Sequence, residues 1–298
     1  MKKQVGGRRG TAAMLACCAL VLSSALATAQ GEVDPLLANW QRTDKPVMDG
    51  VVNRTWMWGP QATAYLTWES YADAPSGKRK VIYFDKSRME ITDPNAERDD
   101  PWYVSNGLLV VELVSGKLQT GHQRFENLTP ASVNVAGDAS DPNGVTYATL
   151  AKLRAPYSGP EPGPLTWTLD RAGNIGVDAR FASFDVETTW YEPATGHWVA
   201  EPFWELMTSS GTVWEDADYH DEALFADPFY ATGFPITEAY WIEVLLDGQP
   251  EDVLLQCFER RCLTWTPSNP DGWKVEAGNV GLHYYIWRYG EPPPKPVG

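Results

Sequence analysis

The sequence predicts a mainly β protein with two related β-hairpin-rich modules and a middle region that contains short helices. Three observations predict this architecture. A set of five landmarks occurs twice along the chain, in the same order. The segments between the landmarks have the pattern strand, polar turn, strand. The chain also carries 14 Trp, 13 Tyr and 9 Phe, and small β modules need such large side chains to fill their cores.

The landmarks keep nearly equal spacings in the two copies. Pro precedes Tyr by five residues in both copies, and it precedes Phe by 24 residues in the first copy and 23 in the second. Each copy then ends in Trp-x-Val-x-x-Gly. The first copy contains Gly59-Pro60, Tyr65, Phe84-Asp85-Lys86 and residues 102–107, and the second contains Gly233-Phe234-Pro235, Tyr240, Phe258-Glu259-Arg260 and residues 273–278.

In each copy the landmarks predict strands and turns. Proline after glycine fixes a turn from which a strand begins. Four strands are expected to begin at aromatic residues: Tyr65, Trp102, Tyr240 and Trp273. Glycine is expected to end the last strand of each copy, at Gly107 and Gly278. Hairpins are predicted over 81–91 and 253–266, with polar turns at 85–87 and 258–261.

The rest of the chain predicts short helices and linkers. Residues 35–41 are expected to form a helix capped by Asp34, and residues 201–207 a helix with Pro202 near its start. Residues 165–174 resemble a strand that enters a turn. The resulting organisation is a signal peptide at 1–29, a first β module at 30–136, a middle region and linker at 137–195, a second β module at 196–290 and a Pro-rich tail at 291–298.

Residues 1–29 have the pattern of a secretory signal peptide. A basic segment with Lys2, Lys3, Arg8 and Arg9 precedes an apolar stretch, and Ala27-Thr28-Ala29 matches a cleavage site. The pattern predicts a secreted protein, extracellular or associated with the cell envelope. A retained anchor, twin-arginine export and lipidation at Cys17 are weaker alternatives. No later segment approaches the roughly 20 apolar residues of a membrane span.

Signal removal would leave two cysteines, Cys257 and Cys262, on either side of the second predicted hairpin turn. Opposed strand positions bring Cβ atoms close enough for a disulfide, and export to an oxidising compartment favours one. A pair of free thiols is the alternative. A zinc site is disfavoured, because two further ligands at suitable spacing are missing.

The formal net charge of −15 argues against nucleic acid and anionic lipid as partners. Four of the 24 basic residues and none of the 39 acidic residues lie in 1–29, so the remaining chain is still more acidic. Phosphate binding needs a basic face, so no nucleic-acid partner is expected. The same charge disfavours docking on anionic lipid.

Three segments, 56–60, 83–91 and 256–261, resemble an uncharacterised family of secreted bacterial proteins. Members of that family carry a phrase like Gln-Tyr-Phe-Glu-Arg-x-Arg-Phe-Glu in similar duplicated modules, often beside envelope or hydrolase domains. The resemblance covers most of 40–115 and 195–290, and it implies no established activity. The motifs in this chain are Tyr-Phe-Asp-Lys-Ser-Arg-Met-Glu-Ile at 83–91 and Gln-Cys-Phe-Glu-Arg-Arg at 256–261.

The second copy is also loosely similar to the LGFP repeat of bacterial cell-wall-associated proteins. Residues 233–238 resemble the start of that repeat, and Phe258 with residues 263–265 resembles its aromatic hairpin. This similarity implies attachment to the envelope. The match departs in spacing, the repeat is not tandem, and the first copy lacks Thr-Glu after Pro60.

The chain has no recognisable catalytic or metal-binding motif. It lacks a G-x-S-x-G elbow, an H-E-x-x-H pair and a P-loop, and its four histidines are far apart. Acidic residues at 215–222, and Asp138, Asp141 and Asn143, could ligate a metal, but a solvated loop and a plain turn are favoured. We therefore expect no catalytic residue, no metal and no cofactor. A carboxylate pair for glycoside cleavage stays open, since no pattern selects one.

Exposed tryptophans are the candidate ligand-binding residues. Trp58 lies at the Gly59-Pro60 turn and is the best candidate for exposure, whereas Trp68 and Trp241 lie in predicted strands and can face either way. Aromatic rings stack on the apolar faces of sugars; core packing is the alternative. The sequence predicts a non-catalytic binding protein for a cell-wall or other polysaccharide. An extracellular protein-interaction or adhesion module and a secreted hydrolase are the alternatives.

Overall fold

A four-stranded antiparallel sheet forms in the first half of the chain. The computed structural model describes residues 33–158 and 163–294. The strands β1 (Tyr65–Ser70), β2 (Lys78–Phe84), β3 (Ser87–Ile91) and β4 (Ser105–Asn106) pair in chain order. The short helix α2 (Leu109–Ser115) follows and ends at Gly116, whose left-handed conformation (φ 70°) suits glycine.

A six-stranded sheet forms in the second half, in the order β16-β15-β14-β13-β7-β8. Four strands are antiparallel neighbours in chain order, and helix α5 (Val280–Tyr289) follows them. These strands are β13 (Tyr240–Leu246), β14 (Gln249–Cys257), β15 (Cys262–Trp265) and β16 (Val275–Ala277). The strands β7 (Trp167–Leu169) and β8 (Ile175–Val177) join through one parallel pairing, between Trp241 and Thr168.

The remaining elements of the described residues are three two-stranded sheets and several helices, of which α1 is the longest. The hairpins are β5 (Lys117–Gly121) with β6 (Arg124–Asn127), β9 (Thr188–Glu192) with β10 (His197–Ala200), and β11 (Ser210–Glu215) with β12 (Asp218–Ala223). The helices are α1 (Pro35–Met48), η1 (Gln61–Thr63), α3 (Tyr147–Leu150), η2 (Ala179–Phe184) and α4 (Glu201–Met207). Within the described residues, no helix is both long and apolar enough to cross a bilayer.

The predicted mainly β character is confirmed, and several elements begin where the sequence predicts. Strands start at Tyr65 and Tyr240, and both hairpins are present. Helix α4 has the predicted bounds, whereas α1 continues to Met48. The predictions of strand starts at Trp102 and Trp273 are wrong. Both residues lie in turns, where their backbone N–H groups donate to Asp100 and Pro270, and the strands begin a few residues later.

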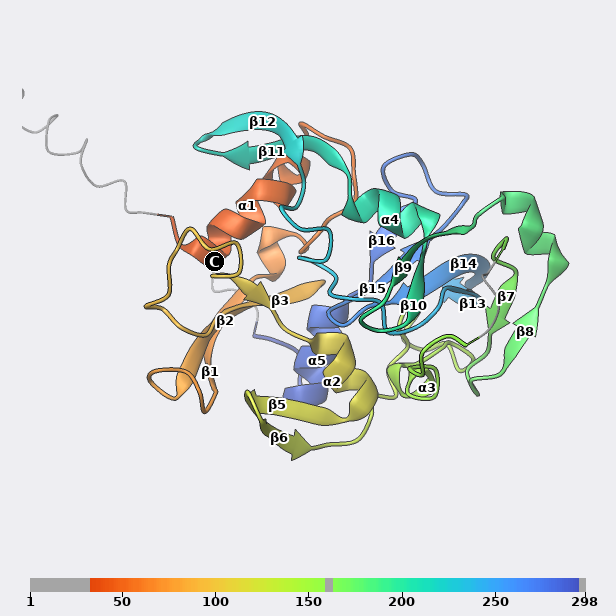
Figure 1. Ribbon diagram of the computed structural model, residues 1–298, viewed down its shortest axis with the longest axis horizontal. Coiled ribbons are helices and arrows are strands. Elements are labelled where there is room, and N and C mark those ends of the chain that lie inside the picture. Colours follow the sequence, from red (N-terminus) through yellow and green to blue (C-terminus); the bar gives the residue numbers. More distant parts are fainter. Residues whose placement is uncertain (1–32, 159–162, 295–298) are drawn as a thin grey trace, which may run out of the picture. The chain divides into compact units, whose positions relative to one another are not determined.

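Each of the two helices that follow the sheets, α2 and α5, contacts the hairpin turn of the opposite sheet. The backbone N–H of Val111, in α2, donates to Glu259 O in the β14–β15 turn at 3.2 Å. The backbone N–H of Leu282, in α5, donates to Asp85 O in the β2–β3 turn at 3.0 Å. Helices α2 and α5 lie side by side (Figure 1). Each helix therefore begins on a turn that belongs to the other sheet.

A buried ionic cluster holds α5 on the first sheet. The carboxylate of Glu69, in β1, is fully buried and lies 2.9 Å from Arg288 of α5, 3.4 Å from Arg88 and 3.5 Å from Arg79. Arg79 and Arg88 also pair with Glu90 at 2.9 and 2.7 Å. A buried carboxylate with three guanidinium partners fixes one arrangement of these elements.

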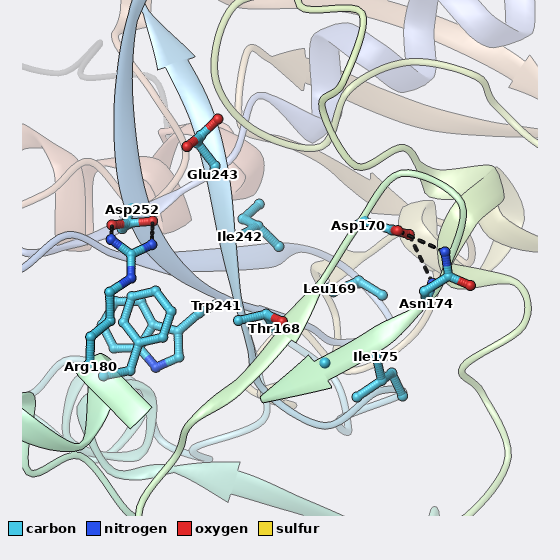
Figure 2. A pocket seen from close by; sticks show the side chains of 12 residues that line it. Thr168, Leu169, Asp170, Asn174, Ile175, Arg180, Trp241, Ile242, Glu243 and Asp252 are labelled. Carbon is cyan, nitrogen blue, oxygen red and sulfur yellow. Dashed lines mark hydrogen bonds and ion pairs between the residues drawn. The ribbon is translucent and has the colours of Figure 1, made fainter. Parts of the chain in front are cut away.

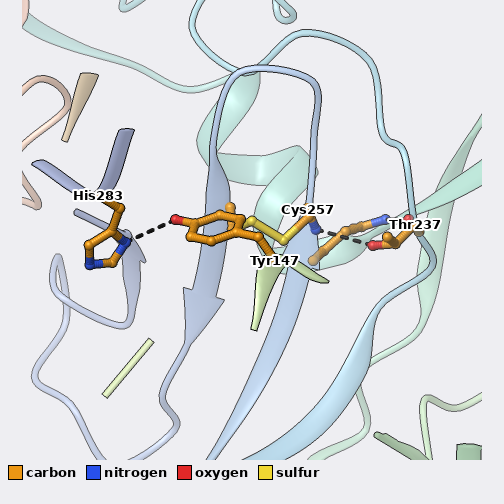
Figure 3. Close-up of a disulfide and its surroundings, with 6 residues drawn as sticks. Tyr147, Thr237, Cys257 and His283 are labelled. Atoms are coloured by element: carbon orange, nitrogen blue, oxygen red, sulfur yellow. Dashed lines mark hydrogen bonds between the residues drawn. A yellow bond between two sulfur atoms is a disulfide. The ribbon is translucent and has the colours of Figure 1, made fainter. Parts of the chain in front are cut away.

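The predicted disulfide between Cys257 and Cys262 is confirmed (Figure 3). The two cysteines are directly opposed partners in β14 and β15, and both are buried. The backbone N–H of Cys257 donates to the Thr237 hydroxyl at 3.2 Å. The bond therefore closes the hairpin whose turn supports α2.

Removal of the disulfide should lower the free energy of unfolding moderately. A cross-link over so short a loop stabilises by about 2 kcal/mol in the chain-entropy estimate. We expect the double variant Cys257→Ala, Cys262→Ala to lose about this much, measured by urea unfolding at neutral pH. The wild-type protein with reductant is the matched comparison. Equal stability of all three samples would contradict this prediction.

Candidate functional site

Trp58 is not the exposed residue that the sequence predicts. The side chain has no exposed surface, and the Arg261 guanidinium lies 4.8 Å from the ring centroid. The reason is the buried carboxylate of Asp44, in α1, which accepts hydrogen bonds from the backbone N–H groups of Met57, Trp58 and Gly59 at 2.7–2.9 Å. This contact places the turn under α1, so Trp58 belongs to the core and has no free face for a ligand.

Trp241 is also buried, with 1% of its surface exposed. Its ring stacks on Phe181 at 4.3 Å and Phe184 at 5.0 Å, and its indole N–H donates to Leu165 O at 2.7 Å. Trp241 does line a surface hollow, but both ring contacts and the indole hydrogen bond are already made within the protein. The prediction that Trp241 is a stacking platform therefore has no exposed ring to support it.

Trp68 is the predicted tryptophan that has a free face, with 58% of its surface exposed. It lies on the edge strand β1, opposite Lys80 of β2. Its alternate neighbour in β1, Leu66, is 49% exposed on the same face. Its ligand-binding role stays a prediction.

The hollow beside Trp241 has a volume of about 360 Å³ and a lining of both polar and apolar residues (Figure 2). Strands β13 and β7 separate there after their single pairing. Glu243 and Asp252 are cross-strand partners, and Arg180 pairs with Asp252 at 2.8 Å. Asp252 is therefore engaged in an ion pair at the surface, and Glu243 is exposed to solvent.

A different group of rings forms a continuous row in which Trp190 is exposed and the other three rings are half-buried. We call Trp190, Trp204, Phe229 and Phe234 the aromatic strip; none of the four is buried. Trp190 of β9 stacks on Trp204 of α4 at 4.5 Å, with the two planes 8° apart. Trp204 lies 5.9 Å from Phe229, and Phe229 lies 4.9 Å from Phe234. Four rings from three separate segments therefore follow one another across the surface.

The aromatic strip ends in a pocket of about 280 Å³, the Trp102 pocket, which Phe229 and Phe234 share with Trp102. Trp102 is 43% exposed. The Arg260 guanidinium lies 5.3 Å from the centroid of its ring and donates to the backbone oxygen of Phe229 at 3.4 Å. Burial lowers the pKa of Arg260, but an arginine keeps its charge at neutral pH.

Two carboxylates complete the Trp102 pocket. Asp227 Oδ1 accepts from the backbone N–H of Phe229 at 2.7 Å, and Glu259 Oε2 accepts from that of Phe234 at 3.1 Å. These hydrogen bonds fix the two carboxylates beside the rings. The pocket thus combines apolar faces with hydrogen-bond acceptors and one guanidinium, which is chemistry for binding a polyhydroxylated ligand.

No protein-family model, curated protein or solved structure matches this chain. The resemblance to secreted bacterial proteins and to LGFP repeats stays a prediction. The aromatic strip and the Trp102 pocket are therefore interpreted from their own chemistry.

The acidic segments considered for metals are engaged in local structure. Residues 215–222 lie in the β11–β12 hairpin, where Glu215 and Glu222 pair with Arg42. Asp138 accepts from the backbone N–H of Gly248 at 2.8 Å, and Asp141 accepts from that of Asn143 at 2.8 Å. In the described part of the chain, no group of three or more His, Cys, Asp or Glu side chains is placed to hold a metal.

Sequence reasoning missed the aromatic strip. Its members come from 190, 204 and 229–234, and Trp102 is distant from all of them in the chain. The aromatic density between 225 and 234 is the one local clue. The row arises only because the turn at Gly233 brings Phe234 against Phe229 and α4 brings Trp204 against Trp190.

Proposed function

We propose that this chain is an exported, non-catalytic binding protein for a cell-wall or other polysaccharide, and that the aromatic strip with the Trp102 pocket is its binding surface. The observation that carries the proposal is the row of partly exposed rings that ends in a pocket with polar groups. The export part rests on the pattern of residues 1–29, which lie outside the described residues.

The chemistry of the surface supports a glycan. Sugar rings present apolar faces that stack on aromatic side chains. The two most exposed rings, Trp190 at one end of the strip and Trp102 in the pocket at its other end, are the surfaces for such contacts. Hydroxyl groups at the chain end would find acceptors in Asp227 and Glu259 and a donor in Arg260. The acidic chain favours neutral or basic glycans over polyanionic envelope polymers.

The proposal includes two related β modules. Its support is that each set of four antiparallel strands is followed by a helix after Gly107 or Gly278. Corresponding residues make corresponding contacts: Lys86 N donates to Trp58 O at 3.2 Å, and Arg260 N donates to Thr232 O at 2.9 Å. The exchanged contacts of α2 and α5 extend this correspondence to the helices. Tyr83 and Arg88 are directly opposed partners in β2 and β3 of the first module. Cys257 and Cys262, which form the disulfide, are the corresponding opposed partners in β14 and β15 of the second.

The test is co-sedimentation of the purified protein with insoluble peptidoglycan, chitin and cellulose, with affinity measured from the depletion of soluble protein. We expect selective binding to at least one of these polymers. Trp102→Ala and Trp190→Ala should each weaken that binding at least tenfold, which corresponds to about 1.4 kcal/mol. Both side chains are substantially exposed, so the variants should keep their fold.

Two further variants decide the location of the site. Phe125→Ala removes another ring, 51% exposed on β6, and should leave binding unchanged. A loss of binding in Trp68→Ala, with full binding in Trp102→Ala and Trp190→Ala, would place the site on β1 and contradict the aromatic strip. No binding of the folded protein to any glycan would contradict the whole proposal and favour a protein partner.

A further inference from the structure

A second cavity, the His283 cavity, has a volume of about 160 Å³. It lies between the end of the second sheet, the start of α5 and the β2–β3 turn. Its polar lining consists of Lys86, Thr264, Thr266, Glu276, Asn279 and His283. Because the volume is well below the roughly 300 Å³ of drug-sized pockets, only a small molecule fits.

Lys86 brings a positive charge to this cavity; its hydrogen-bond partners there are neutral, and the carboxylates of Asp85 and Glu276 are the negative charges that act on it. Its ammonium donates to Ala277 O at 2.8 Å and to Asn279 Oδ1 at 3.1 Å. An ammonium has three N–H donors, so one remains for a ligand. Since lysine can only donate, Asn279 must turn its oxygen toward Lys86, which leaves its amide N–H groups for another acceptor.

His283 adds a donor of defined tautomer. Its Nδ1 lies 3.0 Å from the hydroxyl of Tyr147, which is fully buried (Figure 3). Burial and the neighbouring Lys86 lower the pKa of His283 to about 4, so the ring is neutral at pH 7. The Tyr147 hydroxyl must donate to Nδ1, because a buried hydroxyl proton without a partner is costly. The proton of the neutral ring then resides on Nε2, on the edge away from Tyr147 (Figure 3).

The other side of the His283 cavity offers acceptors and an apolar floor. Glu276 is opposite Thr264 across β15 and β16, and Asn269 donates to one of its carboxylate oxygens at 3.2 Å. Glu276 is one of the residues that line the cavity, and its carboxylate has acceptor capacity beyond this one hydrogen bond. Val135, Val244 and Val253 supply apolar surface. The cavity therefore combines hydrogen-bond donors that can bind an anion, a carboxylate that can bind a cation, and a small apolar surface formed by the three valines.

We propose that the His283 cavity binds a small zwitterion, a free amino acid with a short aliphatic side chain. Its carboxylate accepts from Lys86, Asn279 and His283 Nε2. Its ammonium pairs with Glu276, with the hydroxyls of Thr264 and Thr266 nearby. The short aliphatic side chain of the ligand packs against Val135, Val244 and Val253. A ligand with both charges interacts with Lys86 and Glu276 at once, whereas a ligand with only one charge gives up one of these two interactions.

The test is isothermal titration calorimetry of the full chain with L-alanine, propionate and ethylamine at one pH and ionic strength. Propionate lacks the ammonium and ethylamine lacks the carboxylate. We expect alanine to bind at least tenfold more tightly than either analogue. Lys86→Met and Glu276→Gln should each weaken alanine binding at least tenfold, whereas Lys117→Met, an exposed change on β5, should not.

Thr264→Val keeps the proposal testable if Lys86→Met fails to fold, because it preserves shape and removes one hydroxyl from the cavity; we expect a threefold or larger loss of affinity. No detectable binding of alanine at millimolar concentration would overturn the proposal. Binding of propionate as tight as that of alanine would assign a simple carboxylate and also overturn it. Glycan co-sedimentation is scored separately, so this result and that of the aromatic strip can differ.

Discussion

Glu69→Gln should be the most destabilising single change in the first sheet, with a loss of about 3–5 kcal/mol in the free energy of unfolding. Glu69 has no exposed side-chain surface, and it is the carboxylate paired with Arg288 of α5. The amide of glutamine fills the same space but carries no charge. The variant therefore removes the carboxylate partner of the buried Arg288 and leaves Glu90 as the one carboxylate paired with Arg79 and Arg88, which costs far more than the loss of an exposed ion pair.

The pH dependence of this loss has a definite sign. Burial by itself raises the pKa of Glu69, but the charges of Arg88, Arg288 and Arg79 together lower it to about 2, from 4.5. A carboxyl with a lowered pKa stabilises the fold above its unfolded pKa and loses that effect as the pH falls. The stability difference between wild type and Glu69→Gln should be full at pH 7 and shrink by about 3 kcal/mol between pH 4.5 and 2.

Urea unfolding of both proteins across this pH range measures the difference. Burial raises the pKa of Asp44 to about 6, so Asp44 affects stability with a pH dependence opposite to that of Glu69. This contribution is the same in the wild type and the variant, and it cancels in the difference between them. Glu126→Gln on β6 is an exposed control and should change stability by less than about 0.5 kcal/mol. A constant difference from pH 7 to pH 2 would show that Glu69 does not act through its charge.

Gly281→Ala should destabilise the protein by about 3 kcal/mol, the upper end of the range for overpacking. Alanine in a helix normally gains up to about 1 kcal/mol over glycine, so the expected sign is reversed. A Cβ at Gly281 would lie 2.1 Å from Phe84 O and 2.4 Å from Ser87 O. Both are backbone atoms of the β2–β3 turn, which cannot move without breaking the hydrogen bond from Leu282 to Asp85.

Gly163→Ala is the control, because among the described residues no atom other than those of its chain neighbours lies within 4 Å of the added Cβ. Thermal and urea unfolding of both variants separate the close contact from the intrinsic effect of alanine. We expect Gly281→Ala to unfold at a lower denaturant concentration and Gly163→Ala to behave as wild type. A stabilised Gly281→Ala would mean that α5 does not rest on the first hairpin.

The elements that the sequence predicted well are those with local causes. The hairpin at 253–266 and the disulfide follow from strand patterning on both sides of a short turn. The bounds of α4 follow from Pro202 near its start. Helices α2 and α5 were not predicted. Their segments directly follow the glycines that were expected only to end a strand, and both helices are supported by turns from the opposite sheet.

The candidate sites were predicted poorly for the same reason. Trp58 was expected at the surface because it precedes a Gly-Pro turn, but Asp44, fourteen residues earlier, holds that turn in the core. Trp102 was assigned to a strand, although its ring is exposed beside Arg260. Arg260 and Lys86 occupy corresponding positions after the Phe of each copy, and each lines a pocket. This correspondence is visible in the sequence; the pockets are not.

By itself the sequence determined the mainly β character, the hairpins, the disulfide and the acidic charge that disfavours nucleic acid. These depend on residue type and short spacing, which fix local hydrogen bonding and net charge. Only the tertiary structure decided which tryptophans are exposed and where the aromatic strip and the His283 cavity lie. It also decided that α2 and α5 each contact a hairpin turn of the opposite sheet. Exposure and pocket shape depend on contacts between segments far apart in the chain, and no local pattern specifies those contacts.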